Sequence, residues 1–370
     1  MPEIIPAGNS IFTKEVEIMK KKFAKLVSII MVLTAMVGMM AGCGKKSASD
    51  ELNIYIWSEY IPESVISDFE KETGIKVNIT YYASMDEMMA KLQTGAYKDY
   101  DLIQPYSSEV EALIEQDFIQ EINYDNVPNM KYISSDFLNQ DYDPEQKYTV
   151  PYVYGLDYIC YNKDTCPIEI KSFADLADPA LEGQIVCITS TREIMGMALD
   201  SMGYDPNTTN EDEIAAAGEL LNSIKPNIKV FDGDAPKKEL LNGECSVAIT
   251  YSQDFALAQQ EAGEVYQIAD IDSGYVQVVS QFCVTKDAKN AENAEKFINY
   301  IQEPEVMAAI LDEYPNGCCN TEATNYTSDV YNKYSGTNVS DEMYSKLWRL
   351  VDVGEATTIY DKYWSDFMNE

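Results

Sequence analysis

The fold is decided by residues 52–81, LNIYIWSEYIPESVISDFEKETGIKVNITY. Residues 52–57 and 75–81 are rich in the β-branched and aromatic side chains that favour strands. Between them, residues 62–73 open with a proline and place apolar side chains on one helical face, and Gly74 is a typical helix stop. This strand–helix–strand order predicts an α/β fold with a mostly parallel sheet and helices on both of its faces.

The same alternation extends through the rest of the chain. Further strands are predicted at residues 100–105, 156–161, 184–188, 246–251 and 276–284. Further helices are predicted at residues 85–94, 193–202, 211–223, 291–302 and 304–313, and in a helical tail that contains residues 344–351. Ligands of such sheets lie beyond the carboxyl ends of the strands, so the turns at residues 57–60 and 105–108 are the first places to look for a site.

The N-terminus has the layout of a secretory signal. A basic run at residues 19–25 precedes the apolar residues 26–40, a run that is short for a membrane span. Ala41 and Gly42 then lead to Cys43, an order that resembles the lipobox of bacterial lipoproteins, in which the cysteine carries the lipid. The alternatives are an ordinary signal peptide and an uncleaved anchor.

These features divide the start of the chain. Residues 1–43 are predicted to be a signal peptide, of which residues 1–18 are an extension from an upstream start, and residues 44–50 are a polar tether. Lipidation at Cys43 would hold the remainder outside the cell, on the outer face of the membrane.

Composition excludes several classes of function. The formal net charge is −35, which repels nucleic acid. The chain has no histidine, so Ser-His and Cys-His nucleophile pairs and histidine metal sites are excluded, and neither a metal nor a cofactor is predicted. The cysteines after Cys43 form no C-x-x-C pair and several lie in apolar runs, as Cys187 does, which indicates small core residues. A bridge between Cys160 and Cys166 is the alternative for one pair.

A series of motifs resembles the bacterial spermidine/putrescine-binding proteins, the extracytoplasmic receptors of polyamine ABC transporters. The resemblance covers residues 51–370, and no single motif in it is specific. The matching stretches, in order, are WSEYIP at 57–62, FEKETGIKV at 69–77, YDLI at 100–103, VPYVYG at 150–155, RE at 192–193, YSQD at 251–254, YPN at 314–316 and GEATTIY at 354–360.

The resemblance implies a periplasmic-binding-protein fold of type II, a Venus flytrap of two α/β lobes joined by crossing hinge strands. Lobe one would comprise residues 51–156 and 279–322, and lobe two residues 157–278 and 323–370. The implied function is capture of a small cationic ligand in the cleft between the lobes and its delivery to the permease subunits of an importer. We expect a monomer that performs no catalysis.

The resemblance also implies a set of ligand-binding residues. Glu59, Glu193 and Asp254 match acidic positions that would take up ammonium groups through charge-assisted hydrogen bonds. Aromatic positions would cover the methylene groups of the ligand. The expected ligand-binding residues are Trp57, Ser58, Glu59, Tyr60, Tyr106, Ser107, Ser108, Asp157, Ser190, Glu193, Tyr251, Asp254, Ser280 and Tyr314.

Several positions depart from the family pattern. Ser190 and Ser280 stand where spermidine binders carry aspartates, and a valine and a leucine replace an aromatic residue and a glutamine at Val278 and Leu350. Asp157 lies in an apolar strand and is the candidate to compensate for the lost charge. Three alternatives stay open: a receptor for another small amine-bearing solute, an extracytoplasmic sensor and, least favoured by the missing histidine, a secreted hydrolase.

Overall fold

The computed structural model describes residues 50–369, within a compact unit that comprises Ala48–Glu370. The predicted signal peptide, Cys43 and all of the tether except Asp50 lie outside the described residues. Among residues 50–369, no helix combines the length and the apolar character that a membrane span requires.

The first strands of the chain build one parallel part of the sheet. The strand β1 (Glu51–Trp57) lies between β2 (Lys76–Tyr82) and β3 (Leu102–Ile103), and it pairs in parallel with both. The period-two alternation of β1 directs Ile54 toward a cluster with Phe69 of α2 (Glu63–Thr73), while Tyr55 faces the opposite side of the sheet. Helices therefore cover both faces, as the sequence predicted.

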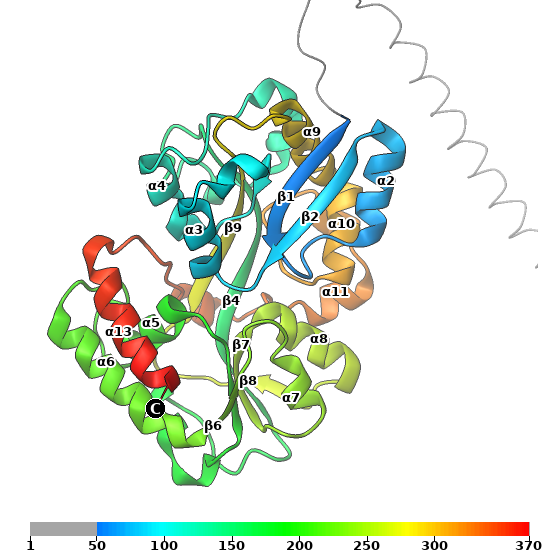
Figure 1. Cartoon of the computed structure of the whole chain (residues 1–370). Coiled ribbons are helices and arrows are strands. Elements are labelled where there is room, and N and C mark those ends of the chain that lie inside the picture. Colours follow the sequence, from blue (N-terminus) through cyan, green and yellow to red (C-terminus); the bar gives the residue numbers. More distant parts are fainter. Residues whose placement is uncertain (1–49, 370) are drawn as a thin grey trace, which may run out of the picture. The chain divides into compact units, whose positions relative to one another are not determined.

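A second parallel part lies further along the sheet. The strand β5 (Ile185–Cys187) pairs in parallel with β6 (Ile228–Phe231) and with β7 (Val247–Tyr251). In Figure 1 this part and its helices form the lower half of the drawing, and β1, β2 and their helices form the upper half.

Two long strands connect these parts. β4 (Val150–Asn162) and β9 (Val276–Val284) run antiparallel to each other along most of their length, with an irregularity between Pro151 and Tyr154. β9 also pairs with β3, and the far end of β4 pairs with β7, so the strand order is β2-β1-β3-β9-β4-β7-β5-β6. Both strands therefore pass from one half of the structure to the other (Figure 1).

The remaining elements pack around this sheet. The short strands β8 (Tyr266–Ile268) and β10 (Gly317–Cys318) pair with β4. The other helices are α3 (Met85–Gln93), α4 (Ser107–Glu115), α5 (Thr191–Ser201), α6 (Glu211–Ile224), α7 (Lys237–Leu241), α8 (Ser252–Ala262), α9 (Ala291–Ile301), α10 (Pro304–Glu313), α11 (Asp329–Tyr334), α12 (Asp341–Ser345) and α13 (Thr357–Asn369).

Buried apolar side chains form separate clusters in the two halves. One cluster joins β1 to α2, α9 and α10, and the other joins β5 and β7 to α5, α6 and α13. Each half therefore has its own core, which allows the two to move as bodies about the strands between them. Ala323 and Tyr331 belong to the cluster of β1, so the chain returns to the other core later than the predicted residue 322.

The prediction of helix across residues 344–351 was wrong beyond Ser345. The helix α12 ends at Ser345, and Trp348 instead forms an isolated parallel bridge with Val276. The Trp348 N–H donates to the carbonyl of Tyr275 at 3.1 Å, and its own carbonyl accepts from the Gln277 N–H at 2.7 Å. The segment thus extends the sheet beside β9, because these bonds satisfy its backbone groups in an extended conformation.

The cysteines among residues 50–369 are all free, so the Cys160–Cys166 bridge is not formed. Cys160 is fully buried in β4, and the thiol of Cys166 donates to the carbonyl of Ile168 at 3.3 Å. Cys187 is fully buried in the apolar core of its half, as its sequence context indicated.

Asp101 connects distant parts of the half built on β1, and we predict that its removal destabilises the protein. Its buried carboxylate accepts from the backbone and side-chain nitrogens of both Asn53 and Asn290, at 2.9 to 3.2 Å. Asp101→Ala leaves these donors without that acceptor, and we expect a loss of about 3 kcal/mol or more in the free energy of unfolding. The measurement is urea denaturation, with the exposed Asp99→Ala as control. Equal midpoints for the two variants would contradict the prediction.

Candidate functional site

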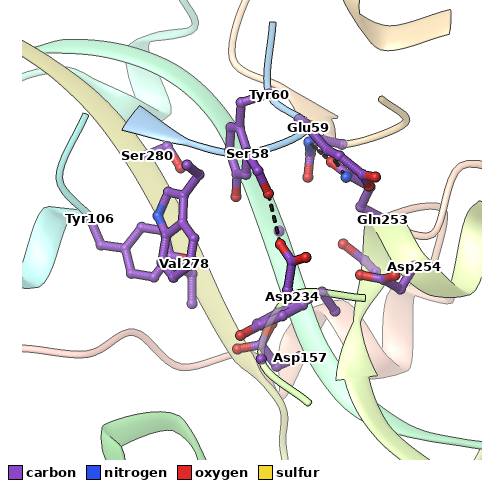
Figure 2. A pocket seen from close by; sticks show the side chains of 16 residues that line it. Ser58, Glu59, Tyr60, Tyr106, Asp157, Asp234, Gln253, Asp254, Val278 and Ser280 are labelled. Atoms are coloured by element: carbon purple, nitrogen blue, oxygen red, sulfur yellow. Dashed lines mark hydrogen bonds between the residues drawn. The ribbon is translucent and has the colours of Figure 1, made fainter. Parts of the chain in front are cut away.

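The candidate site lies where the strand ends of both halves converge on β4 and β9. Two cavities lie there, and Figure 2 shows the first of them. Ser58, Glu59 and Tyr60 lie on one side of it, and Asp157, Asp234 and Asp254 lie across from them. The volume of this first cavity is about 560 Å³, part of which is open to solvent. The lining residues are Trp57, Ser58, Glu59, Tyr60, Tyr106, Gly155, Asp157, Gly233, Asp234, Tyr251, Ser252, Gln253, Asp254, Val278, Ser280 and Asn316.

A second cavity of about 480 Å³ adjoins the first one. The two share Trp57, Tyr106 and Tyr251, so these aromatic side chains stand between them. The other residues that line the second cavity are Ala83, Ser84, Met85, Asp86, Glu109, Thr189, Ser190, Thr191, Arg192, Glu193 and Leu350. We refer to the two cavities together as the cleft, in which these three aromatic residues border both cavities.

Local structure places the aromatic residues at this position. Trp57 is the last residue of β1, and Tyr251 is the last residue of β7. Tyr106 directly precedes α4, and its ring stacks on that of Trp57 with centroids 5.5 Å apart and planes at 21°. The indole nitrogen of Trp57 is buried and has no hydrogen-bond partner, so it is a donor available to a bound molecule.

Asp157 is a buried acid of the first cavity. It lies in β4, only 2 % of it is exposed, and its Oδ2 has no hydrogen-bond partner. Burial raises the pKa of the Asp157 carboxyl well above its usual value, and the charge of Glu193 raises it further. An unpaired carboxylate in such surroundings favours a cation beside it.

Lys237 joins the two halves through two acids that line the first cavity. Its Nζ lies 3.1 Å from Oε2 of Glu59 and 3.1 Å from Oδ1 of Asp254. Burial raises the pKa of Asp254 to about 6, against the opposing effect of the Lys237 charge. Two neighbouring contacts also cross the cleft: Ser58 Oγ donates to Oδ1 of Asp234 at 2.8 Å, and Gln253 Nε2 donates to the carbonyl of Glu59 at 3.3 Å.

Further acids line the second cavity. Burial raises the pKa of Glu193 to about 7, and the nearby Arg192 partly offsets that effect. Burial likewise raises the pKa of Glu109 to about 8, with a further contribution from Glu193, and it raises the pKa of Asp86. Glu193 Oε2 is buried and has no hydrogen-bond partner. This end of the cleft therefore concentrates acidic groups, and Arg192 is the only basic residue among those that line it.

Most of the expected ligand-binding residues line one or both cavities. Three do not: Ser107 and Ser108 lie in the first turn of α4, and Tyr314 lies at the end of α10. Ser108 Oγ instead donates to the Glu109 carboxylate at 2.9 Å. Asn316, two residues after Tyr314, lines the first cavity and donates through Nδ2 to Oε1 of Gln253 at 2.5 Å.

Sequence reasoning missed several polar residues of the cleft. Asp86 and Glu109 lie in the first turns of helices that follow β2 and β3, a position at which the rule for strand ends would have found them. Asp234 lies between β6 and α7, and Lys237 is the first residue of α7. Nothing in their local sequence distinguishes these two residues from solvent-exposed charges. The other missed polar residues are Ser84, Thr189, Thr191, Arg192, Ser252, Gln253 and Asn316.

The comparisons with known proteins agree with this architecture. The family model for the bacterial extracellular solute-binding protein matches residues 64–337. The spermidine/putrescine-binding periplasmic protein of Salmonella typhimurium is 33 % identical over 322 residues, which cover 86 % of this chain and 91 % of the relative. The putrescine-binding periplasmic protein SpuD of Pseudomonas aeruginosa is 31 % identical, over 92 % of this chain and 96 % of its own.

Solved structures give the same result. A Listeria monocytogenes protein assigned to a spermidine/putrescine ABC transporter superimposes with a TM-score of 0.82 at 29 % identity, over 87 % of this chain and 99 % of its own. The TpPotD lipoprotein of Treponema pallidum has a TM-score of 0.76 at 30 % identity, over 86 % and 99 %. These likenesses confirm the predicted periplasmic-binding-protein fold and a binding function in place of catalysis. The chain therefore belongs to the bacterial extracellular solute-binding proteins.

Proposed function

We propose that this protein is the receptor of an ABC importer and that it binds a linear polyamine, putrescine or spermidine, in the cleft. The observation that carries the proposal is the order of groups along the two cavities. Carboxylates lie at both ends, and the rings of Trp57, Tyr106 and Tyr251 stand between them. The names of the relatives, which include spermidine/putrescine-binding proteins, point to the same class of ligand.

The chemistry of a polyamine fits this order. Each ammonium group offers charge-assisted hydrogen bonds to carboxylates, and the methylene chain between two ammonium groups packs against flat rings. Asp157 and Glu193 have oxygens without partners that would accept such bonds. In this proposal, binding changes only the position of the ligand and the conformation of the protein.

The mechanism that we propose is closure about the crossing strands. The lobe built on β1 would present Trp57 to Tyr60, and the lobe built on β5 and β7 would complete the cage with Glu193, Tyr251 and Asp254. The polar contacts across the cleft correspond to the closed form of such a clamp. The closed monomer would then dock on the permease subunits.

We also propose that the protein works outside the cell, tethered by a lipid on Cys43. The order of basic residues, apolar residues and a cysteine after Ala41-Gly42 supports this location.

A second candidate ligand within the same role is a different small solute with one amine. The contact of Lys237 with both Glu59 and Asp254 favours it, because part of the acidic charge already has a partner.

Calorimetric titration tests the proposal directly. We expect putrescine and spermidine to bind, and we expect Glu193→Gln to weaken binding by about ten- to a hundredfold, the equivalent of one charge-assisted hydrogen bond. The exposed Glu219→Gln on α6 is the matched control and should bind as the wild type does. A panel of monoamines and amino compounds accompanies the titration. Absence of heat with every polyamine would refute the proposed ligand class.

Asp157 provides a second test, because it is the acid proposed to compensate for Ser190 and Ser280. Asp157→Asn keeps the shape of the side chain and removes its ability to carry charge, so affinity for putrescine should fall by about ten- to a hundredfold. The folded stability of the ligand-free variant should be equal to or above that of the wild type, since a buried unpaired carboxylate is unfavourable. An unchanged affinity would show that Asp157 does not contact the ligand.

The raised pKa values predict a pH dependence. The pKa of Asp254 is raised to about 6, that of Glu193 to about 7 and that of Glu109 to about 8, in each case chiefly by burial. Carboxyls with raised pKa values stabilise the fold at low pH, and this contribution is lost as pH rises through 6 to 8. The melting temperature of the ligand-free protein should therefore fall over this range.

A cationic ligand should reverse this trend. It favours the ionised carboxylates, so affinity for putrescine should rise between pH 6 and pH 8, and binding at pH 7 should release protons. Titrations in buffers of different ionisation enthalpy measure the number released. In Glu193→Gln the number should be smaller. Proton uptake, or no exchange of protons with any buffer, would contradict the prediction.

A further inference from the structure

Lys237 is the one lysine among the residues at the cleft described above, and it reaches the acids of both halves. Its side chain is 16 % exposed and that of Asp254 is 5 % exposed, while Glu59 remains 45 % exposed. The ammonium group thus sits between two carboxylates at equal distances of 3.1 Å. This is the arrangement that a ligand ammonium group would require at the same place.

The segment before Lys237 is held in position by several contacts. Asp232 Oδ1 accepts from the backbone N–H groups of Asp234 at 2.9 Å and of Ala235 at 3.0 Å, which forms a tight turn ahead of α7. Asp234 in turn accepts from Ser58 across the cleft at 2.8 Å. These hydrogen bonds fix the backbone just before Lys237, whose side chain reaches Glu59 and Asp254.

The acid from the other half is also oriented. Glu59 has a φ of 53°, in the left-handed region that non-glycine residues seldom adopt, and its carbonyl accepts from Gln253 Nε2 at 3.3 Å. The backbone of Glu59 is thus held by a contact that does not involve the Lys237 ammonium group.

We propose that Lys237 is a specificity-determining residue: its ammonium group occupies the cation position between Glu59 and Asp254 and so shortens the ligand that the cleft accepts. This inference rests on the proposed polyamine function. The ligand is left with the acids further along the cleft, which are Asp157, Glu193, Glu109 and Asp86. A diamine can be satisfied there, whereas an additional ammonium group of a triamine must displace Lys237 or meet its positive charge. Discrimination then comes from a repulsive element within the site.

Removal of the charge tests this role. Lys237→Met keeps an apolar stem and frees both carboxylates, so the affinity for spermidine should rise at least tenfold relative to that for putrescine, measured by calorimetry at pH 8 and low ionic strength. Lys237→Gln is the second neutral variant, in case the first does not fold. Lys238→Met is the control, because Lys238 is exposed on the same helix, and it should leave the ratio of affinities unchanged.

A double variant links the effect to the carboxylate. In an Asp254→Asn background, Lys237→Met should shift the ratio of affinities by less than threefold, because an acceptor for the freed position is gone. Binding of both amines with the same ratio in the wild type, Lys237→Met and Lys237→Gln would overturn the specificity role and leave the proposed function standing. No binding of either amine by the wild type and by these variants would overturn the proposed function and this inference with it.

Discussion

The structure depends on carboxylates that the fold holds away from water without enough positive charge to balance them. Asp157 and Glu193 are each 2 % exposed and have oxygens without hydrogen-bond partners. Burial of such groups costs free energy, which appears here as raised pKa values. A fold keeps this unfavourable arrangement only where the remainder of the structure is stable enough to tolerate it, and a cation that enters recovers the loss. We infer that pairing with a cation would offset part of this cost.

The arrangement of the strands explains why this charge can be both buried and reachable. β4 and β9 are the long strands that carry the chain between two separate apolar cores, and Asp157 lies on β4 beside the junction. Because neither core extends through the junction, a rotation about these strands would open the cleft without exposing either core. In the mechanism that we propose, the acids lose contact with water when the halves meet, and a cation that pairs with them would stabilise the closed form.

The sequence predicts the elements better than it predicts the site. The strand at residues 276–284 and the helix at residues 304–313 have the predicted bounds, because long apolar runs and clear start signals specify them locally. Residues 344–351 failed because tertiary pairing with β9 overrides a helical pattern. The role of Lys237 could not be predicted from sequence for a similar reason. Its partner Glu59 is 178 positions away, and the two residues come together only in the folded structure.

The replacement of two family aspartates by Ser190 and Ser280 has to be weighed against the other charged groups of the cleft. The two serines remove charge from two positions, yet Asp86 and Glu109 contribute carboxyls to the cavity that contains Ser190. At the other end, Lys237 neutralises charge that Glu59 and Asp254 would otherwise offer. Acidic groups without a lysine partner are thus concentrated toward the second cavity, away from Glu59. Since a linear amine must match its ammonium groups to the carboxylates along its length, the distribution of charge along the cleft, more than its total, determines which amine fits.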